Sequence, residues 1–195
     1  MLNDRSSALT LLETRRSGRP REMVAPGPSA VELTQILTIG ARTPDHGKLS
    51  PWRFVIVAPE QRDALADLLV TALPESVPDA GPAHLQKAHE FAHQAPTLVV
   101  LIAAPVADHK IPLWEQQLST GAAAMNLLSA AHALGYVGGW ITGWAAYSER
   151  VRAAFCEPGE RIAGFMFLGS PACEVQERPR PALDSVVRQW LPPSA

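Results

Sequence analysis

The spacing of apolar residues changes several times along the chain, and each change predicts a structural element. Apolar residues at helical spacing predict helices over residues 4–14, 29–41, 59–73, 83–94, 116–134 and 147–155. Runs rich in aromatic and β-branched residues predict strands over residues 52–58, 97–104 and 162–168. No internal repeat or linker divides them, and the length suits one hydrophobic core, so we expect a single domain over residues 1–195.

The loop that begins at Arg42 lies between a predicted helix and a predicted strand. It carries Arg42, His46 and Lys48, and its backbone is stiffened by Pro44 and Pro51. A loop held between rigid elements is a common place for ligand contacts, although an ordinary solvated turn has a similar composition.

Residues 116–148 contain no Asp, Glu, Lys or Arg. Polar residues such as Asn126 and His132, and the pair Gly138 and Gly139, interrupt the apolar run, so it does not predict a membrane span. A helix this apolar predicts burial on all sides, and in so small a chain that indicates a dimer whose partner covers it. The apolar residues of the tail, residues 173–195, also suggest that the tail docks on a partner subunit.

Composition excludes several classes of function. Apolar residues make up 47% of the chain, charged residues 18%, and the formal net charge is −2, which gives no reason to expect nucleic acid or a membrane surface as partner. Cys156 and Cys173 form no CxxC pair, and residues 1–10 lack the apolar core of a signal peptide. We therefore expect a cytoplasmic location.

Arg15, Arg16 and Ser17 follow the first predicted helix. Basic residues at a helix C-terminus complement the helix dipole, and Gly18 is a typical stop signal. The same residues equally suit an anion site, with guanidinium donors and a hydroxyl directed at a phosphate.

His89, Glu90 and His93 match the HExxH pattern of zinc hydrolases. Glu115 is a conceivable third ligand, but Pro96 and an apolar strand follow the motif at once, which leaves little room for the usual protease architecture. A zinc hydrolase is therefore kept as a minor alternative.

Several of these features occur in an order typical of one family. They are Arg15-Arg16-Ser17, Pro44-Asp45-His46, Ser50-Pro51-Trp52-Arg53-Phe54, Trp114-Glu115, Gly138-Gly139-Trp140 and Gly164-Phe165 with Phe167-Leu168-Gly169. In this order the chain resembles the FMN-dependent nitroreductases, and most closely their compact NAD(P)H nitroreductase subfamily.

The resemblance implies an α+β fold with a central mixed sheet flanked by helices, and an intertwined homodimer with FMN at the subunit interface. It implies that Arg15, Arg16 and Ser17 bind the phosphate and ribityl side of FMN. Arg42 and His46 would come from the partner subunit, and Trp140, Ile141 and Thr142 would line the flavin. Arg19 and Lys48 are further candidates for a positive group near its pyrimidine end.

The chain departs from the family pattern at two positions. Ile141 stands where close relatives carry Arg, and Ser50 replaces a frequent Gln, so one cation and one polar contact to the flavin are lost.

The activity implied is ping-pong hydride transfer from NADH or NADPH to a small planar acceptor, such as a nitroaromatic or a quinone. No side chain is an obvious general acid, so the catalytic residues stay unassigned. A flavin-binding carrier or sensor without turnover is the alternative.

Overall fold

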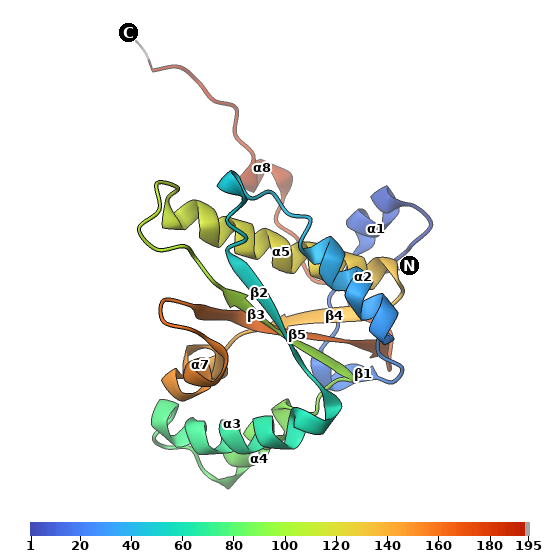
Figure 1. Ribbon diagram of the computed structural model, residues 1–195. Coiled ribbons are helices and arrows are strands. Elements are labelled where there is room, and N and C mark those ends of the chain that lie inside the picture. Colours follow the sequence, from blue (N-terminus) through green and yellow to red (C-terminus); the bar gives the residue numbers. More distant parts are fainter. Residues whose placement is uncertain (194–195) are drawn as a thin grey trace.

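The computed structural model describes residues 1–193 and contains one antiparallel sheet with helices on both faces (Figure 1). Its helices are α1 (Ala8–Thr14), α2 (Ala30–Gly40), α3 (Arg62–Ser76), α4 (Pro82–Phe91), α5 (Leu113–Ala133), α6 (Trp144–Tyr147), α7 (Glu149–Phe155) and α8 (Leu183–Val186), with 3-10 turns at Pro20–Glu22, His46–Lys48 and Pro59–Gln61. Its strands are β1 (Met23–Val24), β2 (Trp52–Val57), β3 (Thr97–Ala103), β4 (Val137–Ile141) and β5 (Arg161–Pro171). The expected α+β class is confirmed.

Strand β5 is the centre of the sheet. It pairs with β3, β4 and β1, and β3 pairs in turn with β2. Every one of these pairs, within residues 1–193, is antiparallel, whereas we expected a mixed sheet. The connections from β2 to β3 and from β4 to β5 return the chain antiparallel to its neighbour, and β5 also runs antiparallel to β3 and β1.

Alternate side chains of β3 and β5 enter two different cores. Phe165 and Phe167 point to the core beneath α3 and α4, and Met166 and Leu168 point to the core beneath α2 and α5. All four are fully buried, as are Leu98 to Ile102 of β3. Both faces of a central strand are therefore apolar, which explains the unbroken apolar runs in the sequence.

Some element boundaries differ from those expected. The first helix was expected from residue 4, but it begins after Ser7, whose side chain caps it by accepting from the Thr10 amide. The predicted helix over residues 147–155 is divided at Ser148, which ends α6 and caps α7. The short strand β1 lies in the proline-rich connector, where no strand was predicted, because two residues carry too little pattern to detect.

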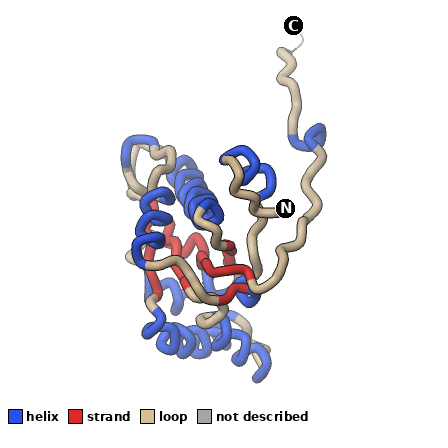
Figure 2. Tube along the Cα trace, turned by 90° about the vertical axis from the view of Figure 1, so that its right-hand side faces the viewer, coloured by secondary structure: helices blue, strands red, loops and turns tan. Residues whose placement is uncertain are grey.

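The tail after β5 extends away from the body of the molecule (Figures 1 and 2). Its large apolar side chains are exposed by 57% to 78%, at Leu183, Val186, Val187, Trp190 and Leu191. The last two residues of the expected docking tail, 194–195, lie outside the described part of the chain. No helix within residues 1–193 combines the length and apolar character that a bilayer span requires.

Candidate functional site

A cationic cavity of about 400 Å³ lies between the segment after α1 and the end of β4. The N-terminal segment contributes Arg15, Arg16 and Ser17, and β4 contributes Trp140 and Ile141. The sequence predicted all five as site residues, and the fold brings them together although more than 120 positions separate the two groups in the sequence.

The two segments approach closely because glycines face each other. The Gly18 amide donates to the Gly138 carbonyl at 3.2 Å. A Cβ atom on Gly139 would lie 2.9 Å from the Gly18 carbonyl oxygen, which is closer than van der Waals contact permits. The glycines of this segment therefore set the distance between the arginines and β4.

The peptide group of Arg16 is held from two sides. Asn3 accepts from the Arg16 amide at 2.7 Å and donates to the Arg16 carbonyl at 3.1 Å. The fully buried His132 of α5 has its Nε2 3.2 Å from the same carbonyl oxygen. A carbonyl can only accept, so Nε2 of His132 carries a proton. Its Nδ1 is buried without a partner among residues 1–193.

Burial keeps His132 uncharged. Desolvation, and to a lesser extent the nearby positive charge of Arg15, together lower the pKa of His132 to about 4. The group that orients Arg16 is consequently neutral throughout the physiological pH range.

The tail adds arginines that the sequence analysis did not assign to the site. Arg178 lines the cavity, and Arg180 donates to the Arg15 carbonyl at 3.4 Å. Burial first, and then the charge of Arg180, lower the pKa of Arg15. Burial, followed by the charges of Arg178 and Arg180, lowers the pKa of Arg16 in the same way. Mutual repulsion of this kind marks a site with more positive charge than the protein itself neutralises.

Two carboxylates offset part of this charge, and one of them, Glu22, accepts from Arg19 of the cavity lining at 3.0 Å. Glu177 pairs with Arg180 at 3.0 Å and lies 4.0 Å from Arg16. The Arg16 Nε donates to the Gln176 carbonyl at 2.8 Å, and Arg15 donates to the Ser17 hydroxyl oxygen at 3.3 Å. The guanidinium groups are thus oriented around Ser17 while positive charge remains in excess, which suits an anion such as phosphate.

The remaining predicted residues lie elsewhere in the single chain. Arg42 and His46 do not line this cavity. The Arg42 carbonyl accepts from Asn126 at 2.8 Å, and His46 pairs with Glu115 at 2.7 Å. Thr142 lines a neighbouring cavity instead.

The loop that carries His46 is locally strained. Lys48 and Ser50 both have positive φ, at 58° and 49°, a backbone conformation that residues other than glycine rarely adopt. The Asp45 carboxylate accepts from the Ser50 amide at 2.7 Å and helps to hold this shape. Such strain costs about 1 kcal/mol or more per residue and is often found where a loop is shaped for binding.

The HExxH residues do not form a metal site. The ring centroids of His89 and His93 are 5.5 Å apart. His93, however, lies beyond the end of α4, and its Nε2 is 3.4 Å from a carboxylate oxygen of Asp63. Glu115, the conceivable third ligand, is engaged with His46. No group of three His, Cys, Asp or Glu side chains suited to a metal ion occurs in the described part of the chain, so the structure gives the zinc alternative no support.

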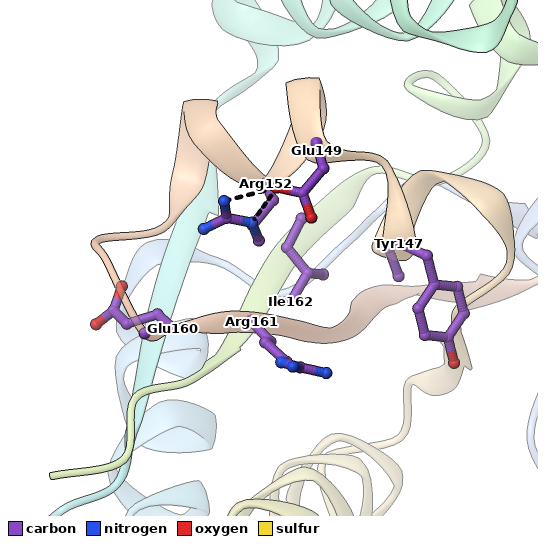
Figure 3. A pocket seen from close by; sticks show the side chains of 8 residues that line it. Tyr147, Glu149, Arg152, Glu160, Arg161 and Ile162 are labelled. Atoms are coloured by element: carbon purple, nitrogen blue, oxygen red, sulfur yellow. Dashed lines mark hydrogen bonds and ion pairs between the residues drawn. The ribbon is translucent and has the colours of Figure 1, made fainter. Parts of the chain in front are cut away.

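A further cavity of about 440 Å³ is lined by residues of α6, α7 and the start of β5 (Figure 3). Its charged groups are largely paired: Arg152 donates to Glu149 at 2.6 Å and 2.8 Å, and Glu160 accepts from Arg53. Arg161 points away from the Glu149 pair in Figure 3. This cavity lacks the charge excess of the first one.

Fold and cavity together describe an α+β protein with a cationic ligand site, and comparison with known proteins defines its family. A sequence model of the Nitroreductase family matches residues 12–170. A Haemophilus influenzae protein named "Putative NAD(P)H nitroreductase" is 38% identical over 165 residues, which cover 84% of this chain and 88% of that protein. YdjA of Escherichia coli K12, with the same description, is 36% identical over 166 residues with the same coverage. The chain belongs to the nitroreductase family.

Solved structures share the fold. A nitroreductase-like family protein from Bacillus cereus superposes with a TM-score of 0.79 at 18% identity, covering 96% of this chain and 98% of that one. A nitroreductase with bound FMN from Bacteroides fragilis gives a TM-score of 0.70 at 20% identity, covering 94% and 100%.

Proposed function

We propose that this protein is an FMN-dependent NAD(P)H oxidoreductase that reduces planar, electron-poor acceptors such as nitroaromatics and quinones. The observation that carries the proposal is the unneutralised arginine cluster around Ser17, placed beside Trp140 and Ile141 in a chain of the nitroreductase family. A phosphate monoester supplies the missing negative charge, and the apolar wall suits a flat ring system.

The residues present fit FMN. Arg15, Arg16 and Ser17 would hold the phosphate with Arg178 beside them, because these side chains surround one cavity. Trp140 is 40% exposed, and its indole nitrogen donates to the Ala163 carbonyl at 2.9 Å, so the ring is fixed at the edge of the cavity. Gly18 and Gly139 hold the arginine segment against β4, so the phosphate ligands and Trp140 line the same cavity.

Bound FMN would supply the redox chemistry, accepting hydride from a reduced nicotinamide and returning two electrons to the acceptor. The protein's own contribution is binding and electrostatics. Arg19 and Lys48 are our candidates for positive charge at the pyrimidine end, where it favours reduction. We assign no side chain as general acid, and take the proton from solvent or from the reduced acceptor.

We further propose a homodimer in which Arg42 and His46 complete the partner's site. Large apolar side chains remain exposed on α5, with Leu113 at 53%, Trp114 at 66% and Leu118 at 53%, and more lie on the tail. Exposed apolar area of this extent is typical of a surface that a second subunit covers. The free thiols Cys156 and Cys173 suit a reducing cytoplasm.

Titration with FMN and with riboflavin tests the site. Arg16→Gln is expected to weaken FMN binding by about tenfold or more, since it removes a charge-assisted phosphate contact, and to leave riboflavin binding nearly unchanged. Arg150→Gln is the matched control, because Arg150 pairs with Glu75 on another surface. Equal losses for both flavins, or no loss for either, would overturn the assignment.

A further inference from the structure

A larger cavity, of about 970 Å³, lies between α4 and the turn from β4 to α6. Arg21, Lys87 and His89 contribute polar groups to its lining, and Phe91 and Trp144 contribute aromatic ones. We name it the α4 cavity.

The α4 cavity adjoins the cationic cavity along two chain segments. Arg19 and Pro20 line the cationic cavity, and Arg21 lines the α4 cavity. In the same way Ile141 lines the first and Thr142 the second. Residues that are consecutive in the chain therefore line the two cavities, which makes the cavities neighbours along both segments.

The cations of the α4 cavity are available to a ligand. Within residues 1–193, neither Arg21 nor Lys87 has a side-chain hydrogen bond or ion pair, and both are exposed. The one acidic side chain in the lining, Glu90, accepts from Gln86 at 2.7 Å. His84 uses Nδ1 to accept from the Gly81 amide and so keeps Nε2 free to donate. The cavity therefore offers donors and positive charge to an anion.

We propose that the α4 cavity binds the adenosine diphosphate part of the nicotinamide donor, with Arg21 and Lys87 contacting its diphosphate. This rests on the proposed function and adds where the donor binds. A dinucleotide carries its charge between two flat rings. Cations on the rim of the α4 cavity suit the diphosphate, the Phe91 and Trp144 side suits adenine, and the Thr142 end leads the nicotinamide toward the cationic cavity.

Donors with and without the diphosphate test the proposal. For Arg21→Ala and Lys87→Ala, kcat/KM with NADH or NADPH is expected to fall roughly five- to tenfold each. With 1-benzyl-1,4-dihydronicotinamide as donor, which has no phosphate, kcat/KM is expected to change by less than about twofold. The contrast between donors also separates ligand contact from a general loss of structure.

Lys110→Ala is the matched control, since Lys110 is exposed and lies outside this cavity. A fall that is equal for both donors, or no fall with NADH and NADPH, would overturn the proposal. Raising the ionic strength is expected to increase KM for NADH in the wild type, and to increase it much less in the double variant that carries both Arg21→Ala and Lys87→Ala.

Direct binding keeps the test independent of turnover. Calorimetric titration of the FMN-loaded wild type with ADP-ribose is expected to give measurable binding that the double variant loses. Absence of binding in the wild type would contradict the α4 cavity proposal. Failure of the proposed function itself would give a different result: no donor, including the benzyl compound, would reduce the flavin.

Discussion

Replacing His132 by Gln is expected to change how stability depends on pH. His132 is fully buried, and desolvation lowers its pKa to about 4, against 6.5 for the free side chain. The unfolded chain therefore binds a proton at this position at higher pH than the folded chain does. Stability due to neutral His132 is complete above about pH 6.5 and is lost as pH falls from 6.5 to 4.

The size of the effect follows from the two pKa values. A difference of about 2.5 units corresponds to about 3 kcal/mol, at about 1.36 kcal/mol per unit. This is a large share of the 5–15 kcal/mol of a typical domain, on the order of a fifth or more. A neutral Gln keeps an amide donor for the Arg16 carbonyl and removes the titration.

Urea unfolding of both proteins at pH 7.5, 6.5, 5.5 and 4.5, at one fixed protein concentration, measures the difference. The wild type is expected to lose about 1 kcal/mol per pH unit relative to His132→Gln below pH 6.5, and nothing above it. The exposed His89 gives a control variant, His89→Gln, that should follow the wild-type curve. Parallel curves for wild type and His132→Gln would refute the reasoning.

Three further predictions concern the cofactor site. Asn3→Ala removes both side-chain hydrogen bonds to the Arg16 peptide, so FMN affinity is expected to fall about tenfold in a fluorescence titration; unchanged affinity would mean that Asn3 does not position Arg16. Gly139→Ala places a Cβ 2.9 Å from the Gly18 carbonyl oxygen and is expected to cost about 1–3 kcal/mol in urea unfolding. Gly121→Ala, inside α5 with nothing within 4 Å of the added Cβ, should cost nothing; equal costs would contradict the close approach. Dialysis against EDTA is expected to leave activity unchanged, and a loss restored by zinc would revive the metal alternative.

The sequence predicted most of the fold because its long elements carry clear patterns. The long helix α5 and the apolar strands β3 and β5 lie where the periodicity indicated, within a few residues. The short strand β1 was missed because it depends on pairing with the distant strand β5. The break at Ser148 was also missed, although it is a local cap in which the Ser148 side chain accepts from the Val151 amide.

The candidate site was predicted in part. Arg15 to Ser17 and Trp140 gather in one cavity, as the resemblance implied. The tail arginines, such as Arg178, were missed because the tail has no periodicity. Only the path of the chain directly after β5 brings the first part of the tail beside Arg16. Thr142 belongs to the next cavity, since alternate residues of a strand end face different sides.

The central claim is that the cationic cavity holds FMN and that the bound flavin is reduced by a nicotinamide donor. The most direct measurement is the absorbance spectrum of purified protein after addition of FMN and desalting, followed by NADH or NADPH under anaerobic conditions. We predict that flavin bands are retained and bleach with at least one of the two nucleotides. Retained flavin that neither nucleotide bleaches would indicate a carrier or sensor, and absence of retained flavin would contradict the account of the site itself.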